Sequence, residues 1–213
     1  MVTRLTDIPD SMELRQRSDQ LCSAGRILYK RGMVPATSGN FSARLRDGHI
    51  LITESGTHKG HLQHDDLLVI DPDGHSVDGR KPSAEAGLHL QIYRRLPEIG
   101  AILHPHSVTA TLLSRSIAQE LEVEGYEMLK AFPGISTHHA RVVIPVFDND
   151  QDIGRLAQRV DDWMDRHEFT IGYLIRGHGF YTWGENVNAA MRHVEALEFL
   201  FECELRQHGD GHR

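Results

Sequence analysis

Apolar residues recur every three or four positions along much of the chain, which is the period of an amphipathic helix. The widest stripe predicts a C-terminal helix over 186–208 that is buried against another surface, and it consists of Val187, Met191, Val194, Leu197 and Phe201. The same period predicts further helices over residues 10–32, 83–96, 107–117 and 152–167. Helices are therefore expected from near the start of the chain to near its end.

Shorter apolar stretches between these helices predict strands, because they have strand length and stop at Gly or Asp-Pro turn signals. They cover residues 49–55, 65–74, 98–104 and 140–147. Residues 170–184 predict two more strands about a Gly-rich turn. Strands bracketed by helices imply a layered α/β/α fold, and a length of 213 residues fits one domain over 1–213.

Composition and charge narrow the classes of function. The formal net charge is −7 and the basic residues are scattered, which argues against nucleic acid as a partner. No stretch approaches the roughly 18 apolar residues of a membrane span, and the first residues do not resemble a signal peptide. Cys22 and Cys203 lack the spacing of a metal pair and are expected to be small core residues in a reducing compartment. We therefore expect a cytoplasmic protein that acts on small molecules.

His104 and His106 stand on either side of Pro105, directly after the predicted strand 98–104. In an extended segment, residues two apart point to the same face, so two imidazoles there can share one metal ion. The chain holds 15 histidines, and a pair of surface histidines at a strand end is the alternative. The spacing by itself leaves both interpretations open.

His178 lies between two glycines in the predicted turn within 170–184. A tight turn would hold its imidazole out from a rigid frame, which makes it a candidate third ligand. Three protein ligands with one open position are typical of a catalytic zinc. His138 and His139 precede a predicted strand, and whether they line the same cavity stays open.

Three polar stretches lie at the boundaries of predicted elements, where binding sites are commonly built. They are "ATSGNFS" (36–42), "ITESGTHKG" (52–60) and "KPSAE" (81–85). The first combines a glycine with hydroxyl and amide groups, the second adds Lys59, and the third precedes a helix whose free N–H groups favour an anion. Each could be an ordinary turn, but together they suggest a phosphate or carboxylate site.

The ordered set "TSGNFS", "ITESG", "KPSAE", "HPHS" and "RGHG" resembles the class II aldolase family, which also contains epimerases, dehydratases and adducin head domains. The resemblance covers nearly the whole chain and implies a three-layer α/β/α domain with a mainly antiparallel central sheet. It also implies one zinc ion per subunit, held by His104, His106 and His178. The implied phosphate contacts are Gly39, Asn40, Ser55, Gly56 and Ser83. Family aldolases commonly have a second serine where this chain has Ala84, so one phosphate contact differs.

Within the family, "GYEMLKAFPGISTH", "IPVFDNDQDI" and "LIRGHGFYTWGE" resemble the dehydratases more than the aldolases. That resemblance implies loss of water from a phosphorylated ketose, with Glu127 as general acid/base. Glu85 is the rival, because aldolases use the glutamate at that position. The resemblance further implies a homotetramer with active sites between subunits. The alternatives are an aldolase or 4-epimerase on fuculose- or ribulose-type phosphates, and a non-catalytic adducin-like module.

Overall fold

The computed structural model describes residues 11–167 and 170–210, and its elements follow the predicted pattern closely. The helices are α1 (Ser11–Lys30), α2 (Ala86–Arg95), α3 (Val108–Ser116), α4 (Ile153–Met164) and α5 (Val187–Asp210). The strands are β1 (Asn40–Arg44), β2 (Ile50–Thr53), β3 (Leu67–Ile70), β4 (Ala101–His104), β5 (Glu120–Glu124), β6 (Arg141–Phe147), β7 (Tyr173–Ile175) and β8 (Gly179–Gly184). Three short 3-10 turns complete the described part, namely η2 (Lys59–His61), η3 (His64–Asp66) and η4 (Glu127–Ala131). Each predicted helix is present with ends shifted by a few residues, although residue 10 lies outside the described range.

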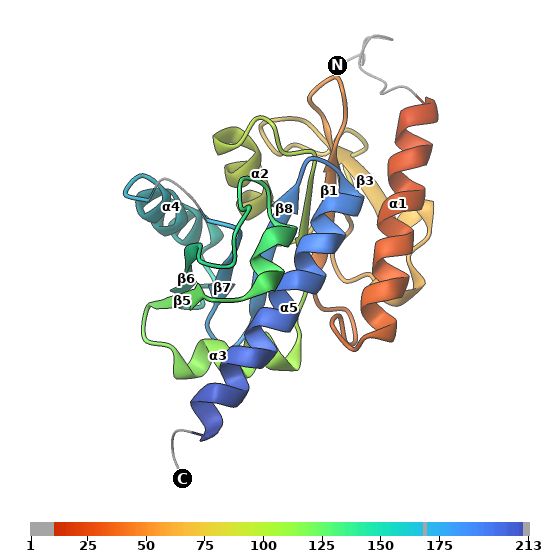
Figure 1. The fold of residues 1–213 in the computed structure, drawn as a ribbon. Helices are drawn as coiled ribbons and strands as arrows, with labels where there is room; N and C mark the ends of the chain where they lie inside the picture. The colour runs from red at the N-terminus through yellow and green to blue at the C-terminus, as the bar shows by residue number, and fades with distance from the viewer. Residues whose placement is uncertain (1–10, 168–169, 211–213) are drawn as a thin grey trace.

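The strands form one eight-stranded sheet in the order β3-β2-β1-β4-β8-β7-β6-β5. Neighbouring strands are antiparallel except β6 and β7, which are parallel. Helices α1, α3 and α5 pack on one face of the sheet, whereas α2 and α4 cover the other face (Figure 1). The prediction of a three-layer α/β/α fold with a mainly antiparallel sheet is confirmed.

Alternation along β4 decides which face carries the histidine pair. Leu103 joins the apolar core beneath α1, α3 and α5, while Ile102 joins the core beneath α2 and α4. Because side chains alternate along a strand, His104 points to the same face as Ile102. The candidate ligands therefore lie on the side of the sheet that α2 covers.

Two strands were not predicted from the apolar pattern. The strand β1 begins inside the stretch that we interpreted as an anion loop, so Asn40 and Ser42 are strand residues with buried side chains. The strand β5 alternates strictly between exposed glutamates and the buried Leu121 and Val123. Its two-residue period is a strand signal, although the segment contains only these two apolar residues.

No helix within residues 11–167 and 170–210 is both long and apolar enough to cross a membrane.

Candidate metal centre and substrate cavity

Four side chains from separate elements converge at one end of the sheet. His104 ends β4 and His106 follows two residues later, while His178 lies in the turn between β7 and β8. Glu85 immediately precedes α2 on the covering layer. Ligand atoms of all four residues lie within 4.8 Å of one another, which is close enough for a single ion.

The three imidazoles present their Nε2 atoms to a common point. Nε2 of His104 lies 2.8 Å from Nε2 of His106 and 3.4 Å from Nε2 of His178. The Glu85 carboxylate closes the group, with Oε2 3.3 Å from Nε2 of His104 and Oε1 3.4 Å from Nε2 of His178. Three imidazole nitrogens and a carboxylate form a donor set suited to zinc.

The backbone fixes the orientation of these rings. Nδ1 of His104 donates a hydrogen bond to the Phe180 carbonyl at 2.8 Å, which leaves Nε2 with its lone pair toward the cluster. A Cβ at Gly179 would lie 2.3 Å from the Pro105 carbonyl and 3.2 Å from the His104 ring, so only glycine allows β8 to approach β4 so closely. The Tyr181 ring stacks on His104 at 4.0 Å between centroids.

Burial keeps the imidazoles of His104 and His106 neutral. It lowers the pKa of His104 well below its usual value, and it lowers the pKa of His106 to about 2, with the neighbouring histidines adding to both shifts. A neutral imidazole can donate its lone pair to a metal, whereas a protonated one cannot. The protonation states therefore fit a metal centre.

Two hydrogen-bond donors hold Glu85 in place beside the histidines. Nδ2 of Asn40 donates to Oε2 at 2.6 Å, and the Tyr181 hydroxyl donates to the same oxygen at 3.2 Å. A carboxylate with these contacts has a fixed position beside the imidazoles. We did not predict Asn40 as a partner of Glu85, because it was expected to contact the substrate phosphate.

A chain of buried hydrogen bonds leads from Asn40 into the layer beneath α2. Nε2 of His89 donates to Oδ1 of Asn40, which turns the amide so that its nitrogen faces Glu85. Nδ1 of His89 accepts from the Ser42 hydroxyl at 2.7 Å, and the Tyr93 hydroxyl donates to Ser42 at 2.9 Å. His89 was not among the site residues predicted from the sequence, although it lies four residues after Glu85, which is one helical turn away.

A cavity of about 340 Å³ opens over the histidines and the polar loops. All five predicted phosphate contacts line it, namely Gly39, Asn40, Ser55, Gly56 and Ser83. Gly39 and Gly56 have φ values of +75° and +80°, a backbone conformation that favours glycine. Ser42 does not line the cavity, because its hydroxyl is fully buried against His89 and Tyr93.

Glu127 lies apart from this group in the single chain. Its side chain is 72% exposed, with Oε1 2.6 Å from Nζ of Lys130 and Oε2 3.8 Å from Nδ1 of His138. Lys130 lowers the pKa of the Glu127 carboxyl below its usual value. His138 and His139 are exposed, His138 beside Glu127, and neither is among the described residues that line the cavity.

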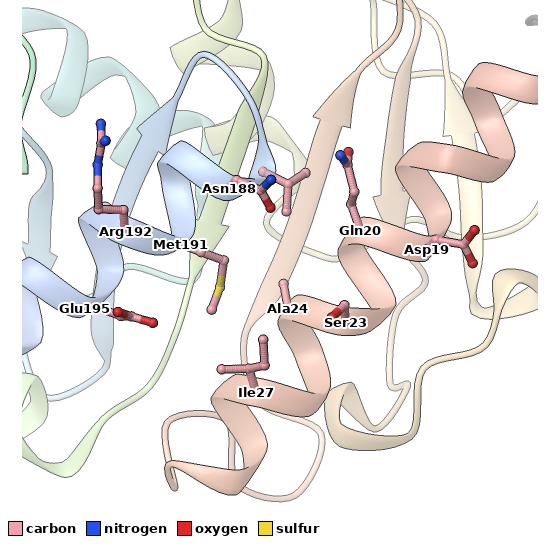
Figure 2. A pocket seen from close by; sticks show the side chains of 10 residues that line it. Asp19, Gln20, Ser23, Ala24, Ile27, Asn188, Met191, Arg192 and Glu195 are labelled. Carbon is pink, nitrogen blue, oxygen red and sulfur yellow. The ribbon is translucent and has the colours of Figure 1, made fainter.

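A separate groove of about 510 Å³ lies between α1 and α5 (Figure 2). Ile27, Ala24 and Met191 line it together with the charged side chains of Asp19, Arg192 and Glu195. It shares no lining residue with the cavity over the histidines. None of the predicted site residues belongs to this groove.

Comparison with known proteins agrees with the arrangement of these elements. Residues 19–205 match the family model described as "Class II Aldolase and Adducin N-terminal domain". The methylthioribulose-1-phosphate dehydratase of Methylococcus capsulatus is 57% identical over 92% of this chain and 97% of its own length. The protein of the same name from Pseudomonas fluorescens is 55% identical over 92% of this chain and 95% of its own length.

Solved structures share the fold at lower identity. An L-fuculose-1-phosphate aldolase from Thermus thermophilus is 26% identical, with a TM-score of 0.74 over 94% of this chain and 99% of that one. A sugar-phosphate aldolase from Thermotoga maritima is 18% identical, with a TM-score of 0.67 over 93% of this chain and 97% of that one. The family match over residues 19–205 and the high identity to full-length relatives show that this chain belongs to the class II aldolase and adducin family.

Proposed function

We propose that this protein is a zinc-dependent hydro-lyase that converts 5-methylthioribulose-1-phosphate to 2,3-diketo-5-methylthiopentyl-1-phosphate, a step of methionine salvage. The observation that carries the proposal is the group of His104, His106, His178 and Glu85 beside a cavity lined by three polar loops. The names of relatives above 50% identity select this reaction from those known in the family. A phosphorylated ketose is thus the proposed substrate.

His104, His106 and His178 are the proposed protein ligands of one zinc ion per chain. Their Nε2 atoms converge, and burial keeps His104 and His106 neutral, while Glu85 stands beside the three rings as a fourth donor. When bound, such an ion supplies a Lewis acid next to the substrate carbonyl. We therefore propose that the reacting carbons lie at the end of the cavity that His106 and His178 line.

The proposed phosphate contacts lie in the loops around the same cavity. Gly39 and Gly56 allow close approach of backbone N–H groups, and Ser55 and Ser83 add hydroxyl donors. Ala84 also lines the cavity and brings no hydroxyl. Asn40 has a second amide hydrogen besides the one donated to Glu85, so it can serve both the phosphate and the carboxylate.

Dehydration requires removal of the proton on carbon 3, next to the carbonyl, and departure of the carbon 4 hydroxyl. The resulting enol becomes the diketone by proton transfer, so one water molecule is lost and no oxidant is needed. A carboxylate that can move between the two carbons can carry both protons. Hydrogen bonds from Asn40 and Tyr181 hold Glu85 in one position. Such a carboxylate is better suited to be a fixed neighbour of the metal than a mobile proton carrier.

Glu127 is the proposed general acid/base. We propose that it acts in the active site of a neighbouring subunit. The ionised carboxylate is the form that removes the carbon 3 proton, and Lys130 beside Glu127 favours that form by lowering its pKa. In its own chain it is exposed and paired with Lys130 rather than placed among the histidines. We therefore propose a homotetramer with shared active sites, in the cytoplasm.

The test is incubation of the zinc-loaded protein with 5-methylthioribulose-1-phosphate, followed by detection of the diketone by mass spectrometry. A mass loss of one water is expected, and it must disappear when a chelator removes the metal. L-fuculose 1-phosphate and L-ribulose 5-phosphate are the matched alternatives. Carbon–carbon cleavage or epimerisation of those sugars without dehydration would replace the proposal, and turnover of none would favour a binding module.

A further inference from the structure

Lys59 is a buried cation in the wall of the candidate substrate cavity. It begins η2 in the second polar loop, and only 2% of the residue is exposed. Its Nζ donates to the Thr37 carbonyl and to the Thr57 carbonyl, each at 2.8 Å. The ammonium thus lies between the first and second polar loops, which are the two loops that hold Gly39 and Gly56.

Among the described residues, the charged side chains around the cavity provide no direct acidic partner for Lys59. Among the described residues that line the cavity, it is the only lysine or arginine. Two lining carboxylates already have arginine partners, since Glu54 pairs with Arg80 at 3.3 Å and Asp150 pairs with Arg155 at 2.6 Å. No carboxylate within 4.0 Å of the Lys59 ammonium occurs in the described part of the chain.

Two carbonyl oxygens satisfy two of the three N–H donors of an ammonium group, which leaves the third available. Buried ammonium groups without a counter-charge are unfavourable, and an arriving anion relieves that cost. Burial lowers the pKa of Lys59 to about 8, while the charges of Glu85 and Asp66 oppose the shift. The group remains mainly protonated at neutral pH and is ready to meet an anion.

We propose that Lys59 supplies the cationic contact to the phosphate monoester of the substrate, and that the Thr37 and Thr57 carbonyls aim its free N–H into the cavity. This inference rests on the proposed function insofar as that function requires a phosphorylated ligand. Ser55, Gly56 and Ser83 then bind the phosphate by neutral donors, and Lys59 provides the charge. The other role open to Lys59 is purely structural, as a link between the two polar loops.

Two substitutions separate these roles. Lys59→Met removes the charge and both hydrogen bonds, while Lys59→Gln removes the charge but keeps an amide that can donate to the two carbonyls. Lys81→Met is the matched control, because Lys81 is exposed two residues before Ser83 and does not line the cavity. Zinc content and the thermal midpoint of the three variants report on folding.

The probe is inorganic phosphate, titrated into each zinc-loaded full-length protein by calorimetry, so that no turnover is required. Loss of a charge-assisted hydrogen bond should weaken phosphate binding about tenfold or more in both Lys59→Met and Lys59→Gln, with no change in Lys81→Met. KM for the phosphorylated ketose should rise similarly, with a smaller change in kcat.

Phosphate affinity equal to that of the unsubstituted protein in Lys59→Gln, with or without a folding defect in Lys59→Met, would assign Lys59 a structural role and overturn the proposal. Absence of phosphate binding by the unsubstituted protein would overturn it as well. If phosphate binding depends on Lys59 but no ketose is dehydrated, the proposed function fails and the anion contact stands.

Discussion

At the scale of single residues, the second ring nitrogen decides what each buried histidine can do. Nδ1 of His104 is occupied by the Phe180 carbonyl, so Nε2 is left for the cluster. Both nitrogens of His89 are occupied, by Asn40 and by Ser42, so His89 cannot be a ligand and instead orients an amide. His193 on α5 is also buried, and its Nδ1 lies 2.6 Å from the Trp183 carbonyl on β8. Residue type and burial alone do not distinguish these cases.

The first prediction concerns metal content. The purified protein should hold about one zinc ion per chain, and His178→Ala should lose both metal and dehydratase activity, because one of three imidazole ligands is gone. Elemental analysis and circular dichroism are the measurements. His75→Ala is the control, since His75 is exposed and lies outside both the cluster and the cavity. Full zinc occupancy in His178→Ala would remove it from the ligand set.

The second prediction concerns pH and His89. Burial lowers the pKa of His89 to about 3, against about 6.5 in an unfolded chain. Between these values the unfolded state binds more protons, so the free energy of unfolding is fully maintained above pH 6.5 and falls as the pH decreases. The slope from this one residue is about 1.4 kcal/mol per pH unit.

Urea unfolding of the metal-free protein between pH 6.5 and pH 4.5 measures that slope. His89→Gln should have lower stability at pH 7 because partners in the buried chain lose a bond, but a shallower dependence on pH. Parallel curves for the two proteins would show that His89 is not held neutral in the folded state.

At the scale of elements, the site depends on the closeness of β4 and β8. The two strands are paired, with Leu103 opposite Thr182, and Gly179 lies against the chain that links His104 to His106. This contact places the turn that carries His178 over the end of β4. The site is thus a consequence of strand pairing rather than of a flexible loop.

The third prediction follows from that contact. Gly179→Ala would place a methyl group 2.3 Å from the Pro105 carbonyl, so β8 or the histidine segment must shift. We expect loss of zinc affinity of at least tenfold together with a lower thermal midpoint. Gly154→Ala in α4 is the control, because its nearest contact would be 3.4 Å away and alanine favours a helix. Equal zinc affinity in the two variants would contradict the role given to Gly179.

Prediction from sequence succeeded for elements with long apolar patterns and failed for β1 and β5, two strands rich in polar residues. The helix α5 and the strand β6 have long apolar patterns, and both were predicted within a few residues. The strand β1 was not predicted, because Asn40 and Ser42 make it resemble a loop while their partners come from the distant α2. Contacts between residues far apart in sequence leave no local pattern. The fold was therefore predictable, but the buried hydrogen bonds that link Asn40, His89 and Ser42 were not.

At the scale of the whole molecule, the position of Glu127 matters most. Within one chain it follows β5 near the far edge of the sheet, whereas the histidines come from the central strands β4 and β8 and their connections. The organisation as one domain over 1–213 and the tetrameric assembly both stay predictions. A shared site between subunits is the arrangement that would bring Glu127 to the metal of another chain.

The fourth prediction tests that arrangement by mixing variants. His104→Ala should be inactive because it lacks metal, and Glu127→Gln should be inactive because it lacks the proton carrier, while the second variant keeps its zinc. When equal amounts are unfolded and refolded together, a site that joins an intact metal from one chain to an intact Glu127 from its neighbour is restored. Random cyclic pairing makes about a quarter of the sites whole, since each requirement is met half of the time. Each variant refolded alone, and the two mixed without unfolding, serve as controls. Mixed assemblies that form, as shown by native mass spectrometry, and yet have no activity would mean that Glu127 acts within its own chain or is not the acid/base.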